Sequence, residues 1–188
     1  MIKINKYFIP YIILLIVIGY KGQLIYTAIV VFFHEIIHYL FSRHYKFSGF
    51  GIEFIAVGAV IKLKDLDEAF PKEDLIISIS GPIFNLIFSG LFYFMYKISY
   101  FNFCYVFFSI NLAIGLFNLI PAFPLDGGRI LRSILNLKLP YRMANKITIL
   151  VSIIVGIMLM LIYVLLFLNG HNNFTIGIIA TFIMTTSL

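Results

Sequence analysis

Long apolar runs separated by short polar stretches occupy most of the chain. The runs lie at about residues 7–20, 23–43, 74–96, 100–123, 147–168 and 173–188. A helix crosses the hydrocarbon core of a bilayer with about 20 apolar residues, so each run is about one span long, and the first and last are short for a full crossing. The pattern predicts an all-α polytopic membrane protein with about six transmembrane helices.

The stretch between the second and third runs, residues 45–72, has a mixed character. Its central part, residues 52–64, is rich in β-branched residues, and the glycines that can form turns around it are Gly49, Gly51 and Gly58. β-branched residues favour extended strands, and glycines favour the turns that join them. We therefore expect a short membrane-associated β-hairpin between the second and third helices.

The composition supports the same class of protein. Hydrophobic residues make up 62% of the chain, charged residues 12%, and the mean hydropathy is +1.04. These values exclude an ordinary soluble domain. Cys104 is the only cysteine in the sequence, so it offers neither a disulfide framework nor a cysteine metal cluster.

The net charge of +6 describes membrane topology rather than a nucleic-acid partner, because the basic residues are spread between the apolar runs. With six spans, all of the 14 lysines and arginines except Lys21 and Lys97 fall on one side of the membrane. Loops rich in lysine and arginine stay in the cytosol. The sequence thus predicts an integral membrane protein with both termini cytosolic and no nucleic-acid partner.

The second apolar run contains the motif His34-Glu35-Ile36-Ile37-His38. Residues four apart share one face of a helix, so both imidazoles can bind one Zn²⁺, and Glu35 lies where it can accept a proton from an attacking water. The alternatives are two histidines that form hydrogen bonds between helices and a glutamate with a structural hydrogen bond. A histidine pair with an adjacent glutamate in a membrane helix favours the zinc interpretation.

A catalytic zinc takes three protein ligands, and Asp126 is the best candidate for the third. It lies in a segment that Pro121 and Pro124 disrupt, next to Gly127 and Gly128, which permit close approach of the backbone. Irregular backbone at membrane depth occurs only where it is buried in protein or faces water. The alternative is that Asp126 caps the helix that follows, since aspartate before two glycines also suits a turn.

The predicted topology places these residues at one depth. The second span enters from the outer side, so His34 and His38 fall in its cytosolic half. The fourth run also leads inward and carries Asp126 to a similar level. We therefore expect an active site toward the cytosolic side of the membrane.

These motifs resemble those of the site-2 protease family of intramembrane zinc metalloproteases. The elements that carry the resemblance are His34–His38, Ser80–Asn85, which matches the family's Gly-Pro-x-x-Asn element, and Pro124–Arg129. The resemblance implies one membrane protease domain over residues 1–188, with a three-helix catalytic core at about 24–132. Residues Asn118–Arg132 and Tyr141–Lys146 are most similar to the stage IV sporulation protease branch, and no C-terminal nucleotide-sensing domain is expected.

The resemblance also implies an activity and partners. One zinc ion per chain would be held by His34, His38 and Asp126, with Glu35 as the catalytic base. Asn85 would position the substrate or stabilise the tetrahedral intermediate; the alternative is that it bonds between membrane helices. The substrate would be a membrane-associated protein, in the sporulation branch a sigma-factor precursor, and membrane proteins would act as inhibitors.

Two other classes of function are open from the residues. A membrane metal-ion carrier would pass a cation along the same histidines and aspartate, but it needs polar ligands in both halves of the bilayer, and the outer halves offer only Lys21 and Lys97. A catalytically inactive membrane scaffold has no need of the general base Glu35. Both alternatives are therefore less favoured than the protease.

Overall fold

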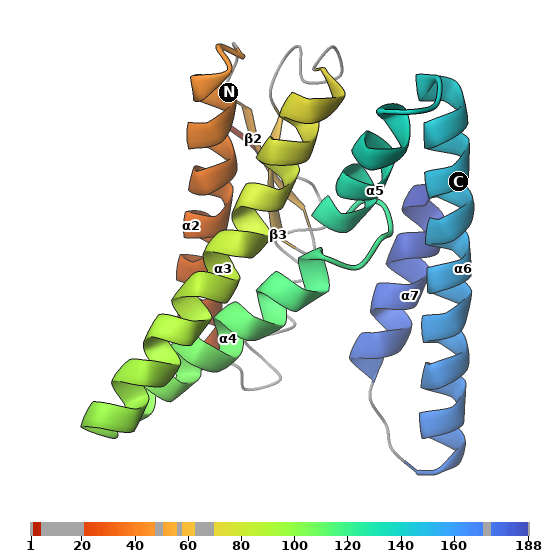
Figure 1. The fold of residues 1–188 in the computed structure, drawn as a ribbon. Helices are drawn as coiled ribbons and strands as arrows, with labels where there is room; N and C mark the ends of the chain where they lie inside the picture. The colour runs from red at the N-terminus through yellow and green to blue at the C-terminus, as the bar shows by residue number, and fades with distance from the viewer. Residues whose placement is uncertain are drawn as a thin grey trace. The chain divides into compact units, whose positions relative to one another are not determined.

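The computed structural model describes residues 2–4, 21–47, 51–55, 58–62, 70–170 and 174–187. The elements in chain order are β1 (Ile2–Ile4), α2 (Lys21–His44), β2 (Gly51–Ile55), β3 (Gly58–Lys62), α3 (Pro71–Ser99), α4 (Asn102–Asn118), α5 (Asp126–Asn136), α6 (Tyr141–Leu168) and α7 (Phe174–Ser187) (Figure 1). The described part of the chain is therefore mainly helical, as the apolar runs predict. The predicted first span, residues 7–20, lies outside the described residues.

Three of the described helices are long and apolar enough to cross a membrane. They cover Leu24–His44, Pro71–Ser99 and Tyr141–Leu168, and they coincide with the predicted second, third and fifth spans. The predicted fourth and sixth spans correspond to the shorter apolar helices α4 and α7. The number of spans stays a prediction, because these two helices are too short to meet the same criterion.

The strands form one small sheet in the order β1-β2-β3. β1 pairs with β2 in parallel, whereas β2 and β3 are antiparallel, with Gly51 opposite Lys62 and Ile55 opposite Gly58. β3 lies against α2. The two antiparallel strands thus occupy residues 51–62 of the stretch in which a hairpin is expected, and association of this stretch with the membrane stays a prediction.

The chain divides into two compact units. Unit 1 comprises Met1–Ala69 and Ser80–Leu116, and unit 2 comprises Phe70–Ile79 and Phe117–Leu188. The boundary falls inside α3, so the first turns of this helix belong to unit 2 and the remainder belongs to unit 1.

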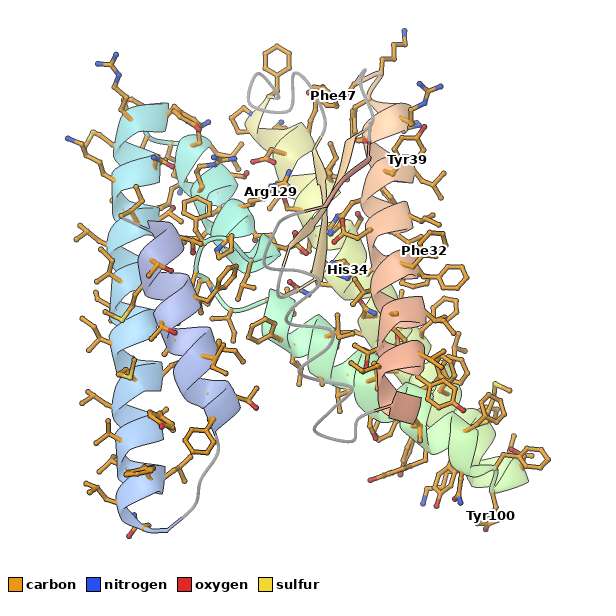
Figure 2. The ribbon with its side chains drawn as sticks, turned by 180° about the vertical axis from the view of Figure 1, so that it is seen from behind. Phe32, His34, Tyr39, Phe47, Tyr100 and Arg129 are labelled. Atoms are coloured by element: carbon orange, nitrogen blue, oxygen red, sulfur yellow. The ribbon has the colours of Figure 1, made fainter. Side chains whose placement is uncertain are left out.

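In unit 1, α2 has one face buried and one face exposed. His34 is 3% exposed and Phe32 is 58% exposed, and Figure 2 shows their side chains on opposite faces of the helix. An apolar face this exposed is what a lipid-facing helix requires. In the sequence only the two histidines mark the buried face, because the helix is apolar almost all round.

Aromatic rings hold α3 and α4 together in unit 1. The rings of Phe92 and Phe107 stack with their centroids 5.0 Å apart, and Tyr26 of α2 meets Phe107 edge to face at 5.3 Å. The Ser89 hydroxyl donates a hydrogen bond of 3.1 Å to the Phe108 carbonyl, which ties the two helices at the same interface. These aromatic residues therefore serve packing, in stacked and edge-on arrangements of their rings.

The segment between α4 and α5 is irregular, as Pro121 and Pro124 predict. α4 ends at Asn118 and α5 begins at Asp126. A Cβ on Gly127 would lie 2.6 Å from the Leu119 carbonyl carbon, and one on Gly128 would lie 2.6 Å from the Phe123 nitrogen. Such distances are far shorter than real contacts, so the two glycines are required for the backbone to fold back on the start of α5, and the prediction of close approach is confirmed.

The other helices of unit 2 support this irregular segment. The buried Ser152 hydroxyl on α6 accepts a hydrogen bond of 2.9 Å from the Phe123 backbone N–H. Ala122, Leu125 and Ile183 of α7 form a small apolar core, and α7 packs along α6. An irregular backbone needs partners of this kind, since each unpaired polar group costs several kcal/mol in an apolar environment.

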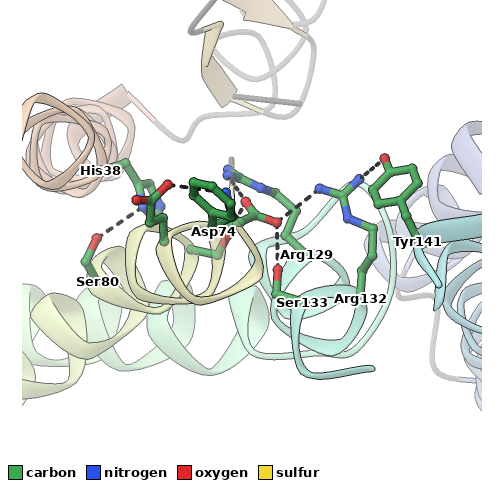
Figure 3. Close-up of polar contacts among 10 residues, drawn as sticks. His38, Asp74, Ser80, Arg129, Arg132, Ser133 and Tyr141 are labelled. Atoms are coloured by element: carbon green, nitrogen blue, oxygen red, sulfur yellow. Dashed lines mark hydrogen bonds and ion pairs between the residues drawn. The ribbon is translucent and has the colours of Figure 1, made fainter. Parts of the chain in front are cut away.

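A buried carboxylate holds α5 against the first turn of α3 in unit 2 (Figure 3). Asp74, 5% exposed, accepts hydrogen bonds from Arg129 Nη2 at 2.7 Å, Arg132 Nη2 at 3.1 Å and the Ser133 hydroxyl at 2.6 Å. Arg132 also donates to the Tyr141 hydroxyl at 3.1 Å, which connects the cluster to α6. The Ser78 hydroxyl of α3 also donates to Asp74 at 3.4 Å, so two guanidinium groups and two hydroxyls surround one carboxylate where three helices meet.

Replacement of Asp74 should show how much this cluster stabilises the protein. We expect Asp74→Ala to lower the free energy of unfolding by about 3 kcal/mol, because two partly buried guanidinium groups lose their carboxylate. In a chain of this size that loss corresponds to a Tm about 6–12 °C lower, measured by thermal unfolding in detergent.

Glu73→Ala is the matched control, since this neighbouring carboxylate caps the exposed Phe70 N–H at 3.2 Å. Loss of such a cap costs about 1 kcal/mol or less. Equal melting temperatures for the two variants would show that the Asp74 cluster does not hold α5 in place.

Candidate metal centre

The two histidines of α2 bring their ring nitrogens together. His34 and His38 are 3% and 5% exposed, and their Nε2 atoms lie 3.0 Å apart. Two nitrogens that bind one tetrahedral Zn²⁺ at about 2.0–2.1 Å lie about 3.3 Å from each other. The pair is therefore placed to share one ion, as the spacing along the helix predicts.

Residues of the Ser80–Asn85 element hold both rings from the opposite side. The Nδ1–H of His34 donates a hydrogen bond to Oδ1 of Asn85, whose side chain is fully buried. Nδ1 of His38 lies 3.4 Å from the Ser80 hydroxyl. Histidines that bind a metal commonly use their second nitrogen in this way, which fixes the orientation of the ring.

Gly81 allows α3 to approach these rings. A Cβ at this position would lie 2.7 Å from Cε1 of His34 and still closer to Nε2 of His38. No side chain other than hydrogen fits there without displacing an imidazole. Position 81 of the Ser80–Asn85 element must therefore be glycine for steric reasons. The neighbouring residues in the sequence do not show this requirement.

Asn85 forms hydrogen bonds to two other helices, as in the alternative given for it from the sequence. Its Oδ1 accepts the hydrogen bond from His34, and its Nδ2 donates one of 3.0 Å to Oδ1 of Asn111 on α4. Both ends of the amide therefore bond to protein. Direct contact of Asn85 with the substrate or the tetrahedral intermediate stays a prediction, and what the structure shows is a bond to a candidate zinc ligand.

The remaining predicted residues are Glu35 in unit 1 and Asp126 in unit 2. Glu35 is half-buried on α2, directly after His34. Asp126 is half-buried and is the first residue of α5, whose N-cap is Leu125. Asp126 is therefore the first helical residue, and the N-cap position itself is occupied by Leu125. The N-terminal turn of a helix favours a carboxylate in its anionic form, which is the form a metal ligand needs.

The donor set fits zinc. His34, His38 and Asp126 each offer one ligand atom, and none of the three is exposed. Two imidazoles and one carboxylate are a usual ligand set of catalytic zinc.

The sequence predicts these three residues as ligands. It does not predict the contacts of Ser80, Asn111 and Asp74, because each of them acts through a bond to another helix.

Comparison with known proteins identifies the family. The sequence model of peptidase family M50 matches residues 23–101 and 95–163, and the chain belongs to this family. A zinc metalloprotease from Methanocaldococcus jannaschii is 31% identical in an alignment of 159 residues that covers 78% of this chain and 46% of that protein. The chain thus spans about half the length of this curated relative.

A solved structure supports the same family. The site-2 protease from Methanocaldococcus jannaschii superposes with a TM-score of 0.76 and 26% identity, covering 99% of this chain and 88% of the other. Membership of the family, together with three described helices long and apolar enough to cross a bilayer, makes this chain an integral membrane protein of peptidase family M50. The family also implies zinc as the metal.

A methyl group at Gly81 should disturb the metal centre. We expect Gly81→Ala to weaken zinc binding by about 10-fold or more, because the displaced imidazole must give up its bond to Asn85 or Ser80. The affinity is measured in detergent by competition with a chromophoric chelator.

The matched control is Gly90→Ala on the same helix, where a Cβ meets nothing within 4 Å. Alanine is the better helix former, so this variant should bind zinc as the wild type does and be slightly more stable, by about 0.5–1 kcal/mol. Equal zinc affinities for the two variants would contradict the steric argument.

Proposed function

We propose that this protein is an intramembrane zinc endopeptidase that cleaves a membrane-associated protein substrate. The observation that carries the proposal is the pair of buried Nε2 atoms, 3.0 Å apart, in an apolar helix of a chain from peptidase family M50. Ionisable groups are costly among membrane helices, so they are rare there and are usually retained for a function.

His34, His38 and Asp126 are the proposed ligands of one zinc ion per chain. Zinc, when bound, supplies a Lewis acid that lowers the pKa of water to near 7. Two neutral imidazoles and one carboxylate leave a coordination position open, as catalytic sites require. The distance between the two Nε2 atoms supports the role of the histidines. For Asp126 the support is its carboxylate and its place in Pro124–Arg129, which resembles a motif of the family.

Glu35 is the proposed general base and general acid. Its carboxylate accepts a proton from the attacking water and later gives that proton to the leaving amine of the cleaved peptide bond. Its position next to His34 on the same turn of α2 supports this role. Asn85, bonded to the ring of His34, supports the reaction by holding a ligand in place.

Replacement of Glu35 should separate catalysis from metal binding. We expect Glu35→Gln to reduce cleavage of a membrane-anchored model substrate by about 100-fold or more, because the amide cannot accept the proton. Zinc content, measured by mass spectrometry of the metal, should stay near one ion per chain.

Glu73→Gln serves as the control, since this carboxylate caps the exposed Phe70 backbone N–H and is not one of the proposed catalytic or zinc-binding residues. It should leave both cleavage and zinc content unchanged. Full turnover by Glu35→Gln would contradict the proposed mechanism, and metal flux through vesicles without any cleavage would favour a metal carrier.

The proposed context is the stage IV sporulation protease branch, with a sigma-factor precursor as substrate. What supports it is the sequence of Asn118–Arg132 and Tyr141–Lys146. The distribution of lysine and arginine supports cytosolic termini and an active site toward the cytosol, where such a substrate would lie. Inhibitory membrane proteins are the proposed partners, since a protease of this kind must be restrained until cleavage of its substrate is needed.

Co-expression with a precursor sigma factor tests this context. We expect wild-type protein to shorten a precursor that carries an N-terminal membrane-associated segment, and Glu35→Gln to leave it intact, as measured by immunoblot. A wild-type protein that cleaves the model substrate but not this precursor would refute the sporulation branch and leave the protease standing.

A further inference from the structure

A chain of three hydrogen bonds leads from α4 to the ring of His34. Nδ2 of Asn111 donates to the Phe107 carbonyl at 2.8 Å, and Oδ1 of Asn111 accepts from Nδ2 of Asn85 at 3.0 Å. Oδ1 of Asn85 then accepts from Nδ1–H of His34. Asn111 and Asn85 are 2% and 0% exposed, so water does not compete for these bonds.

The backbone carbonyl at one end gives this chain a single direction. A carbonyl accepts hydrogen bonds and cannot donate, so Asn111 must turn its NH₂ group toward Phe107. Its oxygen then faces Asn85, which must offer its own NH₂ group to Asn111. The oxygen of Asn85 is left facing His34, and an oxygen acceptor requires a proton on Nδ1 of the ring.

The direction of the chain therefore sets the tautomer of His34. A neutral imidazole carries one proton, so a proton on Nδ1 leaves the lone pair on Nε2. Nε2 is the atom that faces Nε2 of His38 at 3.0 Å. The nitrogen with the lone pair is thus the nitrogen that a shared metal ion would bind.

We propose that Asn111 is a positioning residue of the metal centre, which acts through Asn85 to keep His34 in the tautomer that binds zinc. The proposal rests on the proposed function, in which Nε2 of His34 is a zinc ligand. Asn111 lies in the middle of an apolar helix and has no sequence motif that marks it. Without Asn111, the amide of Asn85 could turn over, present its NH₂ group to Nδ1 and move the ring proton to Nε2.

A purely structural role for Asn111 is the competing explanation, because asparagine often bonds between membrane helices. Ser89 provides the matched case. It lies one helical turn beyond Asn85, is 2% exposed and bonds α3 to α4 through the Phe108 carbonyl at 3.1 Å, but it has no connection to His34. A structural role predicts that Ser89 and Asn111 behave alike.

The experiment compares Asn111→Leu, Asn85→Leu, the double variant and Ser89→Ala in the full chain in detergent. Zinc affinity is measured by chelator competition. We expect Asn111→Leu to weaken zinc binding by about 10–100-fold, the usual effect of losing a group that orients a ligand. Ser89→Ala should bind zinc as the wild type does. The double variant should bind zinc no more weakly than Asn85→Leu alone, because Asn111 acts only through Asn85.

Asn111→Ser covers the case in which leucine prevents folding. Its hydroxyl can bond the carbonyl four residues back, as Ser109 does with Tyr105 at 2.9 Å, but it is too short to orient Asn85. It should weaken zinc binding as Asn111→Leu does. Wild-type affinity in a folded Asn111→Ser variant, or losses that add in the double variant, would overturn the proposal.

The tautomer itself gives a readout that does not depend on zinc or on activity. Nitrogen-15 NMR of labelled histidine in the metal-free protein, with His34→Gln to assign the signal, reports which ring nitrogen carries the proton. We expect Nδ1–H in the wild type and in Ser89→Ala, and a shift toward Nε2–H in Asn111→Ser. A wild-type protein that has this tautomer but binds no zinc would refute the proposed function. A wild-type protein that binds zinc, together with an unchanged tautomer in Asn111→Ser, would refute the role of Asn111 alone.

Discussion

The constraint on which this structure depends is that polar groups among apolar helices must be paired. Water is absent from the hydrocarbon core, so an unpaired donor or acceptor costs several kcal/mol there. Among the residues that the structure describes, no buried side-chain nitrogen or oxygen lacks a hydrogen-bond partner. Several of these pairings join two helices, as Asn85 with Asn111 and Asp74 with Ser133 do, and they help to determine which helices pack together.

The candidate metal centre uses the same pairings. The bonds from His34 to Asn85 and from His38 to Ser80 satisfy two buried rings, and they also turn the Nε2 atoms toward each other. Gly81 lets the helix that supplies these partners come close enough. Stability and function thus depend on the same contacts, and a change that loosens the packing of α3 on α2 must also alter metal binding.

In unit 2 a charged cluster serves the segment that carries the third proposed ligand. Asp74 binds Arg129, Arg132 and Ser133, all on α5, the helix that begins with Asp126. Charges that would be costly alone are tolerated because they balance one another and meet the Tyr141 hydroxyl at their edge. The two arginines, which the sequence places on the cytosolic side, therefore also hold α5 against the start of α3.

The sequence by itself determined the helical class, three of the long apolar helices, the histidine pair and the break before Asp126. These features depend on local rules. A span needs about 20 apolar residues, residues four apart share one face of a helix, and proline and glycine change the backbone in known ways. Only the tertiary structure decided the partners of those residues. Asn111, Asp74 and the steric need for Gly81 act between helices that are far apart in the chain, and a single sequence holds no signal of which polar residue will meet which.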